Sequence, residues 1–169
     1  MTDIATTPQQ VQLVKRTFAK IAPIAEQAAD LFYGRLFEIA PQVRPLFKGD
    51  IKAQGRKLMS TIALAVGSLQ KLPELVPVVQ DLGRRHAGYG AKDEHYDIVA
   101  EALLWTLDKA LGPDFTPDVK EAWISVYTTL ADTMKSAAAP SEYSLVRHPG
   151  LAQTGKISRF GHGADLRHA

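Results

Sequence analysis

Residues 77–90 read PVVQDLGRRHAGYG, and this stretch decides the fold. Val79, Leu82 and His86 recur at steps of three and four residues, which places them along one side of a helix. The glycines that follow end that helix. His86 therefore closes an apolar stripe, and its imidazole is expected to point into the core rather than toward water.

A buried neutral imidazole suits a metal, because one ring nitrogen ligates while the other donates a hydrogen bond that fixes the ring. The carbonyl of Leu82, four residues before His86, is the natural acceptor. The alternative is a core histidine satisfied by ordinary hydrogen bonds. Taken alone, this residue favours that alternative.

Helical periodicity extends over most of the chain, and no alternating strand-like run is present. Thr7-Pro8 opens the first helix, because threonine caps and proline is tolerated at the first helical position. A second helix reaches about residue 40, and tight turns follow over 41–47. Further helices are expected over about 51–69, 77–88, 93–111 and from Thr116-Pro117 onward.

Two details of these boundaries are open to test. Pro73 and Pro77 mark an irregular stretch, because proline removes a backbone donor and fixes its own φ angle. Asp93 is the expected cap of the helix that follows the glycines.

The periodicity fails after Ala139-Pro140. The sequence therefore predicts an all-α domain over residues 1–139 and a tail over 140–169, which is expected to be disordered or loosely attached. Residues 141–169 hold four basic and two acidic side chains, a net charge of +2 that equals the net charge of the whole chain. The helical body is thus neutral and gives no electrostatic reason to expect nucleic acid.

Several classes of protein are disfavoured by composition and motif. No apolar run is long enough for a membrane span, and no secretory signal is visible, so a cytoplasmic location is expected. The chain has no cysteine, which excludes disulfides and thiolate sites. Phosphate-binding loops, G-x-S-x-G, H-E-x-x-H and calcium loops are absent. His162 and His168 in the tail are weak evidence for a metal.

Four uncharged side chains are candidates for a ligand pocket. Tyr33 lies among apolar residues, where its phenol needs a partner, either a bound ligand or the backbone. Gln54 lies on the apolar side of its helix and either reaches into a pocket or lies exposed near the helix start. Tyr96 approaches the site of His86 or simply packs. Phe47, after a tight turn, suits contact with a flat ligand.

The basic residues Lys57, Arg84 and Arg85 flank the helices of this expected pocket. They are able to pair with carboxylates of a ligand. For each one singly, a solvated surface charge is the favoured alternative.

Together these residues resemble bacterial single-domain globins, the kin of the globin half of flavohaemoglobins and, more distantly, of neuroglobins. The resemblance covers about residues 5–136. Its segments are LFYGRLF (31–37), VRPLF (43–47), QGRKLM (54–59), LPEL (72–75), LGRRH (82–86), HY (95–96) and EAW (121–123). Their order and spacing are specific in combination.

The resemblance implies a haem b cofactor in a globin fold, with His86 as the proximal iron ligand. It also implies a haem-contacting set of Tyr33, Phe47, Gln54, Lys57, Leu58, Arg85, Tyr96 and Val99. Of these, Phe47 matches the phenylalanine that stacks on the haem, and Tyr33, Gln54 and Leu58 match the distal pocket. Glutamine at the distal position implies a penta-coordinate iron with an open sixth site.

One position departs from the flavohaemoglobin pattern. A glutamate late in the last helix of that group hydrogen-bonds the proximal histidine, with support from a tyrosine that matches Tyr96. Counted from Trp123 without gaps, that position is Ala138. His86 is therefore expected to be a neutral imidazole bonded to a backbone carbonyl, which disfavours O–O cleavage.

Three functions are compatible with these residues. The first is reversible binding of O₂, NO or CO for transport or protection, with Tyr33 and Gln54 donating hydrogen bonds to bound O₂. The second is a nitric oxide dioxygenase that works with a separate reductase, since 169 residues leave no room for flavin and nicotinamide domains. The third, a haem-free regulator, is disfavoured by His86, Phe47 and the distal pair.

Overall fold

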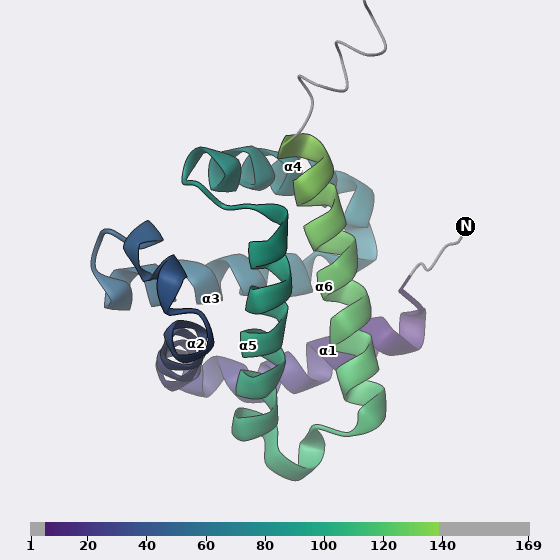
Figure 1. Cartoon of the computed structure of the whole chain (residues 1–169). Coiled ribbons are helices and arrows are strands. Elements are labelled where there is room, and N and C mark those ends of the chain that lie inside the picture. Colours follow the sequence, from purple (N-terminus) through teal and green to yellow (C-terminus); the bar gives the residue numbers. More distant parts are fainter. Residues whose placement is uncertain (1–5, 139–169) are drawn as a thin grey trace, which may run out of the picture.

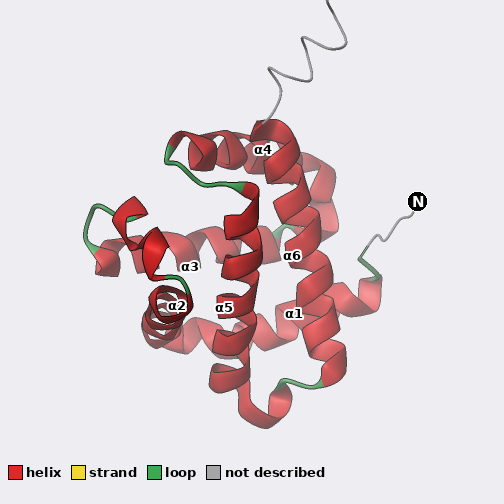
Figure 2. Ribbon diagram, in the orientation of Figure 1, coloured by secondary structure: helices red, strands yellow, loops and turns green. Residues whose placement is uncertain are grey.

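The computed structural model describes residues 6–138, which fold into helices joined by short loops (Figure 1). The α-helices are α1 (Pro8–Ile21), α2 (Ala25–Ile39), α3 (Ile51–Gly67), α4 (Leu72–Gly88), α5 (Asp93–Leu111) and α6 (Pro117–Ala138). Short 3-10 helices join them: η1 (Ala22–Ile24), η2 (Pro41–Leu46), η3 (Leu69–Lys71) and η4 (Gly112–Asp114). No strand occurs among these residues (Figure 2), so the all-α prediction is confirmed.

The predicted starts of the first and last helices are confirmed by their caps. The Thr7 hydroxyl accepts from the Gln10 backbone N–H at 3.1 Å, and the Gln10 side chain accepts from the Thr7 N–H at 3.0 Å. At the start of α6 the Thr116 hydroxyl accepts from the Val119 N–H at 3.3 Å. Each bond satisfies a donor that the helix itself leaves unpaired.

Two expectations about where α4 and α5 begin are wrong. The stretch around Pro73 and Pro77 is helical, because α4 begins at Leu72. Pro73 lies in the first turn, where its missing N–H had no helical partner, and Pro77 removes a single helical bond. Asp93 is the first residue of α5 rather than its cap. Lys92 holds the cap position, and its N–H donates to His95 Nδ1 at 3.0 Å.

The largest core cluster joins α1, α3, α5 and α6 around Trp123. The buried indole N–H of Trp123 donates to the Thr17 hydroxyl at 2.9 Å, and that hydroxyl donates in turn to the Leu13 carbonyl at 2.7 Å. A buried polar group without such a partner is costly. The bonds therefore let α6 pack on α1 with its indole satisfied.

Helices α4 and α6 approach each other closely at Gly83. A Cβ atom built there would lie 2.6 Å from the Met134 Cα and would also overlap the Met134 carbonyl. Only glycine fits this contact. The contact fixes the lateral position of α6 against the helix that carries His86.

Within residues 6–138, no helix alone has the length and apolar character to span a membrane; α3 and α4, with a 61° bend between them, reach that length only as a pair. The expectation for the tail over 140–169 concerns residues outside the described range, and so do the tail histidines.

Candidate functional site

His86 lies in the last turn of α4 and is half-buried. Its Nδ1 lies 2.8 Å from the carbonyl oxygen of Leu82, the acceptor predicted from the sequence. A carbonyl only accepts, so this bond places the ring proton on Nδ1. Nε2 then keeps its lone pair for a ligand.

Tyr96, in the first turn of α5, lies beside His86. The two rings have centroids 6.5 Å apart and an interplanar angle of 31°. The Tyr127 hydroxyl of α6 donates to the Tyr96 carbonyl at 2.6 Å, which ties α5 to α6 at this point. Burial, followed by the Asp93 carboxylate, raises the pKa of Tyr96, so its phenol is neutral at physiological pH.

The ammonium of Lys135 lies 5.5 Å from the centre of the Tyr96 ring, on the side of α6. We call His86, Tyr96, Tyr127 and Lys135 the imidazole cluster. Tyr127 and Lys135 were not among the residues predicted from the sequence. Their place on α6 depends on how that helix packs against α4 and α5.

An aromatic cluster lies on α2 and directly after η2. It consists of Phe32, Tyr33, Phe37 and Phe47. The Tyr33 ring lies 4.9, 5.9 and 5.5 Å from the rings of Phe32, Phe37 and Phe47, and Phe37 and Phe47 are 5.4 Å apart. Such tilted and edge-on contacts are the favourable geometries for aromatic pairs. The structure thus brings two predicted residues, Tyr33 and Phe47, into direct contact, and it adds Phe37.

Tyr33 is 4% exposed, and burial raises the pKa of its phenol to about 12, with a smaller opposing effect from a hydrogen bond with the Gln54 side chain. Gln54 is half-buried in the first turn of α3. The structure therefore brings the predicted polar pair together. At neutral pH the Tyr33 hydroxyl keeps its proton and remains a donor.

Half-buried apolar residues surround these two clusters. Leu58 of α3 and Val99 of α5 pack on the aromatic cluster, whereas Leu82 packs near Tyr96. Val99 lies one helical turn after Tyr96, so α5 contributes to both clusters. The site is thus bounded by apolar side chains that the protein covers only in part.

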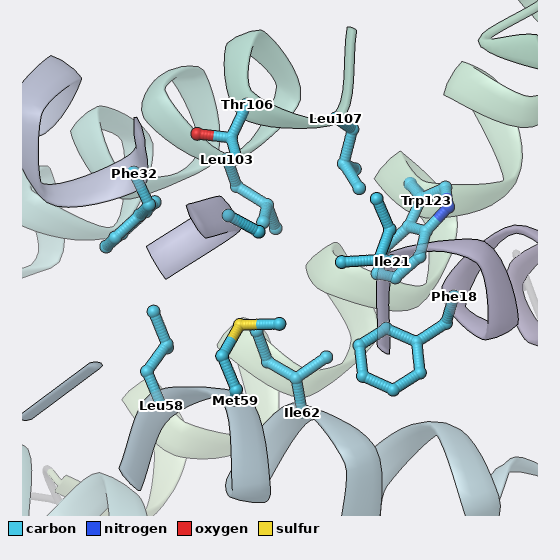
Figure 3. A pocket seen from close by; sticks show the side chains of 11 residues that line it. Phe18, Ile21, Phe32, Leu58, Met59, Ile62, Leu103, Thr106, Leu107 and Trp123 are labelled. Atoms are coloured by element: carbon cyan, nitrogen blue, oxygen red, sulfur yellow. The ribbon is translucent and has the colours of Figure 1, made fainter. Parts of the chain in front are cut away.

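An apolar cavity lies next to the aromatic cluster (Figure 3). Its volume is about 20 Å³, and Phe32, Leu58, Met59 and Leu103 are among the side chains that line it. The hydroxyl of Thr106, which also lines it, donates to the Ala102 carbonyl at 2.8 Å and leaves the wall apolar. A cavity of this kind has room for about one small molecule and does not attract water.

Two predicted contact residues are exposed. Lys57 is exposed on α3. Arg85 is exposed on α4, where its guanidinium forms an ion pair with Asp81 at 2.9 Å. Arg84, the other basic candidate, is also exposed. Their assignment to a ligand stays a prediction. Within residues 6–138 no three His, Cys, Asp or Glu side chains group as metal ligands.

A family comparison matches residues 30–134 of this chain to the globin model. That range includes the aromatic cluster and, of the imidazole cluster, all residues except Lys135. Among curated proteins, the flavohemoprotein of Bacillus subtilis is 30% identical over 125 residues, which are 72% of this chain and 31% of the relative. The flavohemoprotein of Halalkalibacterium halodurans is 33% identical over 132 residues, 76% of this chain and 32% of the relative. The chain thus spans about a third of the length of these relatives.

The chain is also similar in fold to solved protein structures. An engineered carbene transferase from Rhodothermus marinus, described as a candidate nitric oxide dioxygenase, aligns with a TM-score of 0.74 and 26% identity, over 83% of this chain and 98% of that one. A bacterial globin from Campylobacter jejuni aligns with a TM-score of 0.72 and 24% identity, over 80% and 99%. A hexacoordinated heme protein from a tardigrade, 13% identical with a TM-score of 0.71 over 78% and 94%, shares the fold. The chain belongs to the globin family.

Proposed function

We propose that this globin binds haem b through His86 Nε2 and reversibly binds a diatomic gas, O₂ above all, on the side of Tyr33 and Gln54. The observation that carries the proposal is the hydrogen bond from His86 Nδ1 to the Leu82 carbonyl at 2.8 Å. It selects the tautomer whose Nε2 is free to ligate. Haem needs only one such ligand from the protein, and bound haem supplies an iron with a coordination position for the gas.

The residues present fit a flat apolar group. Leu58, Leu82 and Val99 are apolar and only half-buried by protein, and they lie around His86 and the aromatic cluster. Covering such surface is favourable by about 25 cal/mol for each Å². Phe47, held by its contacts with Tyr33 and Phe37, presents a further aromatic surface.

The distal residues explain how a gas is retained. Tyr33 and Gln54 each bring a hydrogen-bond donor to one place, and burial keeps the Tyr33 phenol protonated. A buried hydrogen bond to a partly negative oxygen contributes about 1–3 kcal/mol. The apolar cavity beside Leu58 gives room for a small gas molecule near the same side.

A nitric oxide dioxygenase that works with a separate reductase is the second candidate. The observation that favours it is the similarity to flavohemoproteins and to the Rhodothermus marinus protein. The carbonyl-bonded imidazole favours reversible binding instead, because His86 has no carboxylate partner among the described residues. A histidine without such a partner donates less electron density to iron.

Absorption spectra of the ferric, ferrous and O₂-exposed protein test the proposal. We expect the wild type to take up one haem per chain, and His86→Ala to retain at least tenfold less. Free imidazole added to His86→Ala restores the ferrous spectrum if only the ligand is missing. His95→Ala is the control. It removes an imidazole near the same loop, but that imidazole accepts the Lys92 N–H and is not the proposed iron ligand. A wild type without haem, or a His86→Ala protein with wild-type spectra, contradicts the proposal.

A second measurement separates the two candidates. The oxygenated protein is mixed with NO in a stopped-flow instrument while a flavin reductase and NADH reduce the iron again. A gas-binding protein whose ferric iron the reductase does not reduce reacts for a single turnover and then stops. Sustained consumption of NO identifies the dioxygenase.

A further inference from the structure

Lys135 on α6 is a cation with a defined contact close to the proposed iron ligand. Its ammonium lies 5.5 Å from the centre of the Tyr96 ring, and that ring lies 6.5 Å from the His86 ring. Tyr96 is therefore the shared neighbour of the ammonium and the imidazole. A cation over the face of an aromatic ring is held there by the ring's quadrupole.

Two contacts fix the position of Lys135. The next residue back along α6, Met134, lies against Gly83, three residues before His86, and leaves no room for a Cβ. The Tyr127 hydroxyl holds the Tyr96 backbone at 2.6 Å, two helical turns before Lys135. The α6 backbone around Lys135 is thus held against both α4 and α5.

Within the described residues, Lys135 takes part in no ion pair. The ion pairs within residues 6–138 are Lys20–Asp114, Arg35–Glu38, Lys52–Asp30 and Arg85–Asp81, and none includes Lys135. Asp93 acts on Tyr96 and Asp97 on Tyr127, but both carboxylates belong to exposed residues. Lys135 is half-buried, so water screens it less than it screens the two acids.

We propose that Lys135 is a positioning residue that places a positive charge beside the Tyr96 ring, which adjoins the His86 ligand, and thereby favours the ferrous form of the haem. The inference rests on the proposed function. Its physical basis is Coulombic: oxidation adds a positive charge at the iron, and a nearby cation makes that addition less favourable. A carboxylate in this region would have the opposite effect, and Ala138 provides none.

A potentiometric titration of the haem-loaded protein tests this inference. At a fixed applied potential, Lys135→Met is expected to lower the ratio of ferrous to ferric protein by about three- to tenfold, as expected for the loss of one partly screened charge near the iron ligand. Lys135→Glu is expected to lower it further, and Lys135→Arg to keep the wild-type ratio. Lys120→Met is the matched control. It removes the same charge from the same helix, but about 22 Å farther along the axis.

The outcomes separate this inference from the proposed function. A wild type that takes up no haem overturns both. A haem-loaded wild type whose ratio matches that of Lys135→Met overturns the inference alone. Equal shifts in Lys135→Met and Lys120→Met also overturn it, because they reveal a general charge effect. A loss that Lys135→Arg fails to restore indicates a packing role instead and overturns it too.

Discussion

The aromatic cluster and the imidazole cluster hold their residues in place by different means. The aromatic cluster depends on side chains: three phenylalanine rings, each with its centroid within 6 Å of the Tyr33 ring, surround that phenol, which is 4% exposed. The imidazole cluster depends on the backbone. Carbonyls of Leu82 and Tyr96 accept from His86 and Tyr127, and Gly83 meets the Met134 backbone directly.

This difference predicts how each side responds to substitution. A cluster made of side chains tolerates small changes of volume and loses mainly the chemical group that is removed. A cluster made of backbone contacts has no side chain that is able to move aside. The predictions below test this contrast, from the largest expected effect to the smallest.

Gly83→Ala is expected to break the imidazole cluster. The added methyl group would lie 2.6 Å from the Met134 Cα, so α4 and α6 have to separate. We expect the free energy of unfolding to fall by about 3 kcal/mol, measured by urea denaturation. The shift of α6 also moves Lys135, so the ferrous fraction at fixed potential should fall as well. An unchanged urea midpoint would show that this helix contact is not tight.

Gly34→Ala is the matched control for that variant. Gly34 also lies inside a helix, α2, but a Cβ there meets nothing within 4 Å. Alanine costs less conformational entropy than glycine in a helix, so this variant is expected to gain about 0.5–1 kcal/mol. Opposite signs for the two substitutions would attribute the loss at Gly83 to the contact with α6.

Tyr33→Phe is expected to act on the aromatic cluster without disturbing its packing. The rings around position 33 remain, and only the hydroxyl is lost. Loss of one buried hydrogen bond to the ligand, about 2 kcal/mol, should raise the O₂ dissociation rate about 30-fold in a stopped-flow measurement. Tyr96→Phe, on the imidazole side, should change this rate less than twofold. Equal effects of the two variants would argue against Tyr33 as the distal donor.

Much of the fold followed from local patterns. Thr7 and Thr116 marked helix starts because threonine, proline and the apolar period agree there, and both caps are present. The irregular stretch predicted at Pro77 was wrong, because a proline removes only its own backbone hydrogen bond. The packing of the rest of α4 keeps that residue helical.

The parts of the candidate site that depend on single residues were predictable from the sequence. The bond between His86 and Leu82 lies within one helix turn, so spacing alone predicts it. Lys135 was missed because the helical period assigns a residue to a face and does not give the rotation of one helix against another. Gly83 offered the available clue, since glycine inside a helix is costly unless a close contact requires it.

A smaller effect concerns the pH dependence of stability on the aromatic side. The folded-state pKa of Tyr33 is about 12, against an ordinary value of 10.0. The unfolded chain therefore loses this proton first as the pH rises. The contribution of the buried phenol is complete below pH 10 and is lost between about pH 10 and 12, at up to about 1.4 kcal/mol per pH unit. Urea unfolding at pH 9, 10 and 11 should show a smaller decline in Tyr33→Phe than in the wild type. Tyr89→Phe, in which the exposed Tyr89 ring is altered instead, should decline like the wild type. If all three proteins decline in parallel, burial of the Tyr33 phenol does not determine the alkaline limit of the fold.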